Sequence, residues 1–157
     1  MKIPIYQIDA FADGPFQGNP AAVCPLVDWL SDSVLQAIAE ENNLAETAFY
    51  VQRDAEIHLR WFTPTTEVDL CGHATLAAAD VVFQRATSLL SFVTFQSRSG
   101  ELTVTREENG MLTLNFPAQP GMPAETPSAL VEGLGAEPIA YFRSEDHMAV
   151  FEDEATV

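Results

Sequence analysis

Hydrophobic and polar residues alternate along several short stretches of the chain, a pattern that predicts β-strands. The alternation is clearest in residues 57–62, where Ile57, Leu59 and Trp61 fall on one face of the predicted strand. Other strand-length segments, apolar or alternating and bounded by turn residues, are 3–11, 21–27, 47–52, 92–97, 101–106 and 111–116. Residues 47–52 and 57–62 are close enough in the sequence to form a hairpin.

Two segments in this part of the chain have helical patterns instead. Ser31 or Asp32 can cap a helix whose apolar residues share one face and which ends near Asn43. Residues 72–84 are rich in alanine, nearly uncharged and apolar around most of the helix circumference, which is typical of a buried helix. We therefore predict an α+β fold in which a barrel-like, mostly antiparallel sheet is wrapped around this central helix.

The composition changes at a proline-rich stretch, residues 117–123, which is typical of a linker. The residues after it predict one short helix, 129–134, and two strands, 139–142 and 147–151. One helix and two strands are too few to bury a core of their own. We therefore expect a first domain at 1–118, followed at 119–157 by a linker and the truncated start of a second, similar domain.

The composition excludes several classes of protein. The 157 residues include 7 Lys and Arg against 23 Asp and Glu, and the net charge of −16 repels nucleic acids and anionic membranes. The sequence has no apolar run long enough to cross a membrane, and its N-terminus lacks the apolar segment of a secretory signal. We therefore expect a cytoplasmic protein that binds neither nucleic acids nor membranes.

The clearest chemical signal is the run Cys71-Gly72-His73 at the predicted start of the buried helix. Free backbone N–H groups and the helix dipole make a helix N-terminus an anion site, and glycine lets a ligand approach the backbone. The same surroundings are expected to lower the pKa of the Cys71 thiol. A structural reading is equally open, in which Cys71 is a small buried apolar residue and His73 caps the helix.

Glu46 is a second candidate, because it lies between a helix end and an apolar strand, where a half-buried carboxylate can act as a general acid or base. Taken alone, a solvated loop glutamate is the better interpretation. Asn19, in a Gly-Asn-Pro turn, has an amide that can bind a ligand or simply shape the turn. His58 and His147 have no paired ligand nearby, and no nucleotide-binding motif is present, so we expect neither a metal nor a nucleotide cofactor.

Four segments in this order and spacing resemble the PhzF-like family of phenazine-biosynthesis isomerases. They are Phe16-x-Gly-Asn-Pro-Ala-Ala-Val23, Glu41-Asn-Asn-Leu-Ala-Glu-Thr47, Phe62-Thr-Pro64 and Cys71-Gly-His-Ala-Thr75. The resemblance extends from the first predicted strand to about residue 118. It implies the fold of diaminopimelate epimerase, in which two pseudo-symmetric halves, each a sheet around a central helix, enclose the active site.

The resemblance also implies an activity, namely a cofactor-independent isomerase that moves a proton in a small carboxylate substrate, and a homodimer. Glu46 and His73 match the family's catalytic residues. We expect Asn19, Cys71, Gly72 and His73 to bind the substrate, and the Gly72 and His73 backbone amides match the family's site for the substrate carboxylate. Cys71 stands where related epimerases carry a catalytic thiol, and its role is left open. Neither the substrate nor a part in phenazine synthesis is implied.

The chain departs from this family in length, since members are about twice as long and nothing here matches the acid-bearing motif of their second half. Because acid and base must be positioned on both sides of a substrate, we expect the isolated chain to be inactive. Two other functions stay open. One is an amino-acid racemase or epimerase that uses Cys71, and the other is a protein that binds small anions without turnover.

Overall fold

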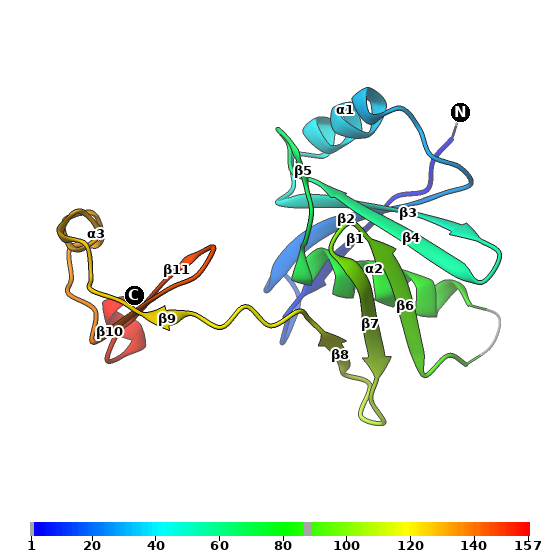
Figure 1. The fold of residues 1–157 in the computed structure, drawn as a ribbon. Coiled ribbons are helices and arrows are strands. Elements are labelled where there is room, and N and C mark those ends of the chain that lie inside the picture. The colour runs from blue at the N-terminus through cyan, green and yellow to red at the C-terminus, as the bar shows by residue number, and fades with distance from the viewer. Residues whose placement is uncertain (1, 87–88) are drawn as a thin grey trace. The chain divides into compact units, whose positions relative to one another are not determined.

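The structure, a computed structural model, describes residues 2–86 and 89–157, and the chain divides into two compact units, Met1–Phe116 and Pro117–Val157. The first unit contains a sheet of eight strands and two helices (Figure 1). In chain order its elements are β1 (Tyr6–Ala10), β2 (Asn19–Leu26), α1 (Asp32–Asn42), β3 (Glu46–Arg53), β4 (Glu56–Phe62), β5 (Glu67–Val68), α2 (Gly72–Arg85), β6 (Phe92–Ser97), β7 (Gly100–Arg106) and β8 (Leu112–Asn115).

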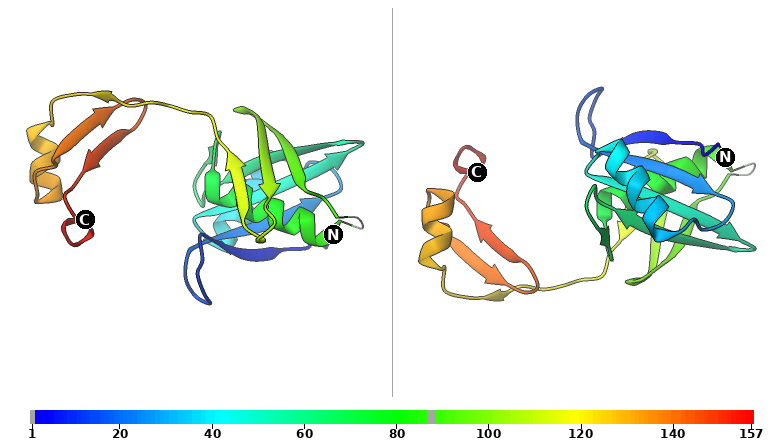
Figure 2. Two further views of the ribbon diagram at one scale, coloured as in Figure 1. Left: turned by 90° about the horizontal axis from the view of Figure 1, so that it is seen from below. Right: turned by 90° about the horizontal axis from the view of Figure 1, so that it is seen from above.

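The sheet of the first unit curls around α2. Its strands follow the order β1-β2-β3-β4-β6-β7-β8, with β5 also paired to β4. Two pairs, β2 with β3 and β4 with β6, are parallel, and the other pairs are antiparallel. The views from below and above show the strands around the helix (Figure 2). The inner faces of the strands and the buried side of α2 form one apolar core, which includes Trp61, Phe95, Ala74 and Ala78.

Helix α1 covers the outer face of the same sheet. It connects β2 to the parallel strand β3, and its Leu35 and Ala39 pack against Cys24, Phe49 and Phe62 in a second apolar cluster. The Phe49 and Phe62 rings meet edge to face, with centroids 5.6 Å apart. The strands in the middle of the sheet are therefore buried on both faces, which explains the continuous apolar run of β3.

The second unit contains a three-stranded antiparallel sheet in the order β11-β10-β9, one helix and a 3₁₀ turn. Its elements are β9 (Met122–Pro123), α3 (Ser128–Leu134), β10 (Ala140–Arg143), β11 (His147–Val150) and η1 (Glu154–Thr156). Tyr141 is buried at 4% exposure, whereas Met122, Ile139 and Met148 are more than half exposed. That this unit is the start of a larger domain stays a prediction.

The predicted helices and most predicted strands agree with the structure to within about two residues at each end. The strand expected at 3–11 is shorter, Tyr6–Ala10, and the two-residue strands β5 and β9 were not predicted. The first unit ends at Phe116, two residues before the predicted domain boundary. Within residues 2–86 and 89–157, no helix has both the length and the apolar character needed to cross a membrane.

Candidate functional site

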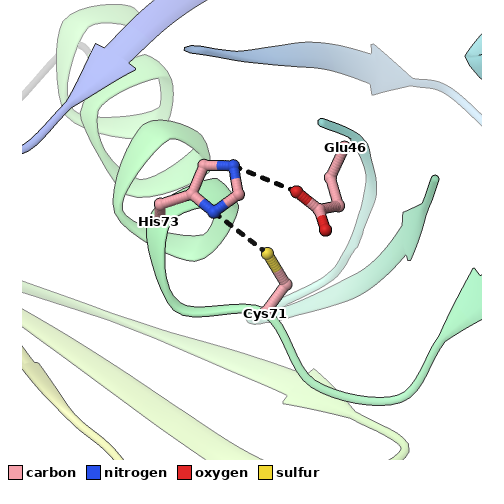
Figure 3. Close-up of side chains that lie close together, drawn as sticks. All are labelled: Glu46, Cys71 and His73. Atoms are coloured by element: carbon pink, nitrogen blue, oxygen red, sulfur yellow. Dashed lines mark hydrogen bonds and ion pairs between the residues drawn. The ribbon is translucent and has the colours of Figure 1, made fainter. Parts of the chain in front are cut away.

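Three of the predicted site residues come together where the first residue of β3 meets the N-terminal end of α2. Figure 3 shows the side chains of Glu46, Cys71 and His73 pointing toward one another. His73 Nε2 lies 3.1 Å from Glu46 Oε2, and His73 Nδ1 lies 3.5 Å from the Cys71 sulfur. Cys71 and His73 are each 8% exposed, and the Glu46 side chain is 19% exposed. The site is therefore a small, largely desolvated group of one carboxylate, one imidazole and one thiol.

The turn between α1 and β3 holds Glu46 in place. Asn43 ends α1 in the left-handed conformation, at φ 48°, and its backbone N–H donates to the Ala39 carbonyl at 3.1 Å. The Asn42 side-chain amide then donates to the Thr47 hydroxyl, also at 3.1 Å. These contacts fix both sides of the turn, so the carboxylate of Glu46 is directed by the backbone rather than by a mobile loop.

The N-terminal end of α2 holds Cys71 and His73. Cys71 is the residue before the helix, in an extended conformation, and its carbonyl accepts hydrogen bonds from the Thr75 hydroxyl and the Thr75 N–H. The first turn of the helix has no acidic residue, and the Cys71 side chain does not cap it. Backbone N–H groups at this end are thus available to an anion, and that they bind a substrate carboxylate stays a prediction.

Two buried polar atoms of the site have no hydrogen-bond partner within the described residues, namely Glu46 Oε2 and His73 Nε2. These two atoms are close enough for an ion pair, but the ring N–H is not directed at the oxygen well enough for a hydrogen bond. Buried polar atoms are nearly always hydrogen-bonded in folded proteins. The two atoms therefore form an ion pair but keep hydrogen-bonding capacity that the polar groups of a ligand can use.

The expectation that the helix N-terminus lowers the pKa of Cys71 is wrong. Burial raises the pKa of the Cys71 thiol to about 12, and the nearby Glu46 carboxylate acts in the same direction. The Ala74 backbone N–H near the sulfur opposes this change but is outweighed. Cys71 is therefore a neutral thiol at physiological pH, because loss of water around the sulfur destabilises the thiolate more than the helix N-terminus stabilises it.

Gly72 and Asn19 lie beside this group of three. Gly72 is the first residue of α2, and a Cβ there would meet the Phe116 ring at 3.8 Å, an ordinary contact distance. Asn19 begins β2, two residues before Ala21, which pairs with Glu46 on the adjacent parallel strand. Asn19 is thus one strand away from the carboxylate, at the same end of the sheet.

Several residues that shape the site were not predicted from the sequence. Asn42 and Thr75 position the catalytic candidates through hydrogen bonds, and their signal was weak, because an Asn after a helix and a Thr within one are common. Only the side-chain geometry reveals these roles.

Comparison with known proteins decides the family. The sequence profile of the PhzC-PhzF family, described as phenazine biosynthesis-like protein, matches residues 8–134, which is most of the chain. The chain belongs to the PhzC-PhzF family. An uncharacterized isomerase of Pseudomonas aeruginosa is 54% identical over 157 residues, which is 100% of this chain and 60% of that protein. A second uncharacterized isomerase of the same organism is 47% identical over 152 residues, 96% of this chain and 57% of that protein.

Solved structures of PhzC-PhzF proteins confirm the predicted fold. A PhzF-family phenazine biosynthesis protein from Enterococcus faecalis superposes with a TM-score of 0.91 at 43% identity, over 100% of this chain and 60% of that one. A predicted epimerase from Pseudomonas aeruginosa, at 22% identity, shares the fold alone, with a TM-score of 0.71 over 91% of this chain and 55% of that one. The chain thus spans about 60% of the length of the 54%-identical relative and of the Enterococcus faecalis protein.

Proposed function

We propose that this chain supplies one half of the active site of a cofactor-independent isomerase that moves a proton in a small carboxylate substrate. The observation that carries the proposal is the buried Glu46 Oε2, which makes no hydrogen bond within the described residues, lies 3.1 Å from His73 Nε2 and is close to a helix N-terminus that has no side-chain cap. Glu46 would take a proton from one carbon of the substrate and return it to another. The naming of family relatives as isomerases supports this reaction class.

Each part of the site has a separate task in this proposal. The first N–H groups of α2, at Gly72 and His73, bind the substrate carboxylate, because they combine free donors with the positive end of the helix dipole. His73 orients the Glu46 carboxylate and limits its rotation. Moving a proton between carbon atoms requires a positioned acid or base, and no electron transfer, so the reaction itself demands no redox cofactor.

The substrate must also be held from its other side. The chain spans about 60% of its relatives, and we propose that the remaining part of a full-length member provides the opposite wall and a second acid. We expect the 157-residue chain alone to lack turnover, since one wall cannot position both groups. A homodimer, as the family resemblance suggests, would be formed by the full-length protein.

The test uses a chimera in which this chain is followed by the part of the 54%-identical Pseudomonas aeruginosa relative that lies beyond the matched segment. Proton NMR in D₂O would follow deuterium incorporation into a panel of small unsaturated carboxylates. We expect exchange into at least one of them, and Glu46→Gln should slow it by about 10²- to 10⁴-fold. Glu40→Gln, an exposed glutamate on α1, is the matched control and should leave the rate unchanged.

The proposal is rejected if Glu46→Gln exchanges at a rate within a few fold of the parent chimera. Calorimetric binding of the carboxylates without any deuterium incorporation would instead support the non-catalytic anion-binding function. Turnover by the 157-residue chain alone would contradict the requirement for a second wall.

A second candidate function, racemisation through Cys71, is favoured by one contact, the 3.5 Å approach of its sulfur to His73 Nδ1. A neighbouring imidazole can accept the thiol proton and so generate a nucleophilic thiolate or base. This function requires that Cys71→Ala abolish exchange in the chimera, whereas the glutamate mechanism predicts that exchange persists. The same variant therefore distinguishes the two mechanisms.

A further inference from the structure

The three side chains of the site form a donor set for a metal ion. One carboxylate oxygen of Glu46, the Cys71 sulfur and one ring nitrogen of His73 all lie within 4.8 Å of one another (Figure 3). Sulfur, imidazole nitrogen and carboxylate oxygen are the donor types that zinc binds in proteins, and three protein ligands leave a fourth position open. The sequence pattern did not predict this, because Glu46 is distant in the chain from Cys71 and His73.

The spacing of two of the three donor atoms, the Cys71 sulfur and His73 Nδ1, already fits coordination of one zinc ion. Zinc–sulfur and zinc–nitrogen bonds of about 2.3 and 2.0–2.1 Å at a tetrahedral angle place the two donors about 3.6 Å apart. The Cys71 sulfur and His73 Nδ1 are 3.5 Å apart. The third donor, a carboxylate oxygen of Glu46, lies within 4.8 Å of the other two donor atoms, so a shift of this side chain from its ion pair with His73 closes the set.

An independent observation also points to a ligand at this position. His73 is 92% buried with its Nδ1 on the Cys71 side, and the buried Glu46 Oε2 lacks a hydrogen-bond partner among the residues described. A bound cation would engage the carboxylate and replace the missing partners of this polar group. The protein's negative charge favours a cation, since the net charge is −16.

We propose that Glu46, Cys71 and His73 bind one zinc ion, with water in the fourth position. The zinc ion replaces the proton of the Cys71 thiol, which leaves to the solvent, so the affinity rises with pH. The free N–H groups at the start of α2 help to stabilise the thiolate that forms. Zinc at this position occupies Glu46 and would inhibit proton transfer. That consequence rests on the proposed function, whereas the binding itself does not.

Cobalt(II) is the probe, because a thiolate ligand gives Co²⁺ an intense near-ultraviolet charge-transfer band and exposed carboxylates do not. The reduced, metal-free 157-residue chain is titrated with Co²⁺ and then with Zn²⁺. We expect the band to saturate at one equivalent and to disappear when Zn²⁺ displaces the cobalt. Cys71→Ser should remove the band. Cys24→Ser, at the buried cysteine of the outer apolar cluster, is the matched control and should retain it.

Glu46→Gln tests the third ligand without touching the core. It should keep the band but weaken the affinity for Zn²⁺ by at least about tenfold, the loss that follows even from removing a partner of a metal ligand. Glu40→Gln should bind as the parent does. Circular dichroism checks that each variant is folded. If Cys71→Ser is unfolded, His73→Asn replaces it as the test variant, and this variant should lack the charge-transfer band at one equivalent of Co²⁺.

The proposal is wrong if the folded parent shows no charge-transfer band at one equivalent, or if the band survives unchanged in Cys71→Ser or, where that variant is unfolded, in His73→Asn. Equal Zn²⁺ affinity in Glu46→Gln and the parent would remove Glu46 from the ligand set and overturn the three-residue site. None of these measurements contains a carboxylate substrate, and the deuterium-exchange test contains no metal. The two proposals are therefore tested independently, and the failure of one does not decide the other.

Discussion

At the scale of single residues, burial outweighs local sequence context in this site. The sequence places Cys71 at a helix N-terminus, where a thiolate is usually stabilised. The structure buries the sulfur, and the pKa rises to about 12 instead of falling. Cys24, in the apolar cluster on the other face of the sheet, has its pKa raised by burial to about 11. Neither cysteine should therefore behave as a reactive thiol.

This difference in acidity predicts slow alkylation. A rise from 9.0 to about 12 lowers the thiolate fraction of Cys71 at pH 8 by about 10³-fold. The greater nucleophilicity of a more basic thiolate recovers part of this loss, so we expect alkylation by iodoacetamide to be at least about 30-fold slower than for a free thiol. Mass spectrometry of the folded chain between pH 7 and 10 measures it. The rate should keep rising through this range, and a plateau with a midpoint below pH 9 would show a more acidic thiol.

The site was predictable in its parts but not as an assembly. Glu46 and the Cys71-Gly72-His73 run are separate signals in the sequence, and each had an equally good or better structural interpretation on its own. Their meeting depends on β3 pairing in parallel with β2, which brings the start of β3 to the N-terminal end of α2. Neither periodicity nor composition contains that pairing. The resemblance to a family was what linked the segments before the structure did.

At the scale of elements, the strength of the periodic pattern decided what could be predicted. The apolar β3, the alternating β4 with which it forms a hairpin, and the alanine-rich α2 were predicted within one or two residues. The strands β5 and β9 have two residues each, which is too short for any periodicity to be detected. The parallel pairs could not be predicted either, because the partner of a strand depends on tertiary packing.

The turn after α1 gives a test at this scale. Asn43 is exposed and has a left-handed backbone, so a residue with a Cβ but no polar side chain should be strained there. We expect Asn43→Ala to lower the free energy of unfolding by about 1 kcal/mol, and Asn43→Gly to change it by less than about 0.5 kcal/mol. Urea denaturation of the three proteins measures both values. Equal losses for Ala and Gly would show that the Asn side chain, not the backbone conformation, is what matters.

At the scale of the whole molecule, the buried thiols make stability depend on alkaline pH. Both thiols have a higher pKa in the folded chain than the 9.0 of an exposed cysteine. The folded state therefore keeps protons that the unfolded state releases, so stability is at its full value below pH 9 and falls as pH rises toward 11–12. The buried Tyr50, whose pKa is also raised, acts in the same direction.

We expect the free energy of unfolding to be lower at pH 10 than at pH 8 by about 1.4 kcal/mol for each of the two thiols. Urea denaturation at both pH values measures the difference. A double variant, Cys24→Ala with Cys71→Ala, controls for the repulsion among the acidic groups, which it leaves in place. The variant should be less stable at pH 8, because it loses buried side-chain contacts, and should show a much smaller change between pH 8 and 10. An unchanged pH dependence would assign the effect to the net charge.

The position of α2 in the chain affects how the protein emerges from the ribosome. The helix is the centre of the first unit, yet β6, β7 and β8 of its surrounding sheet follow it in the sequence. About thirty residues separate the end of α2 from the end of β8. Because synthesis adds about 5–20 residues per second, these strands are complete roughly 2–6 s after the helix. During that interval its alanine-rich surface is only partly covered. We therefore expect a chaperone to bind nascent chains that end between α2 and β8, in which the apolar surface of α2 is exposed.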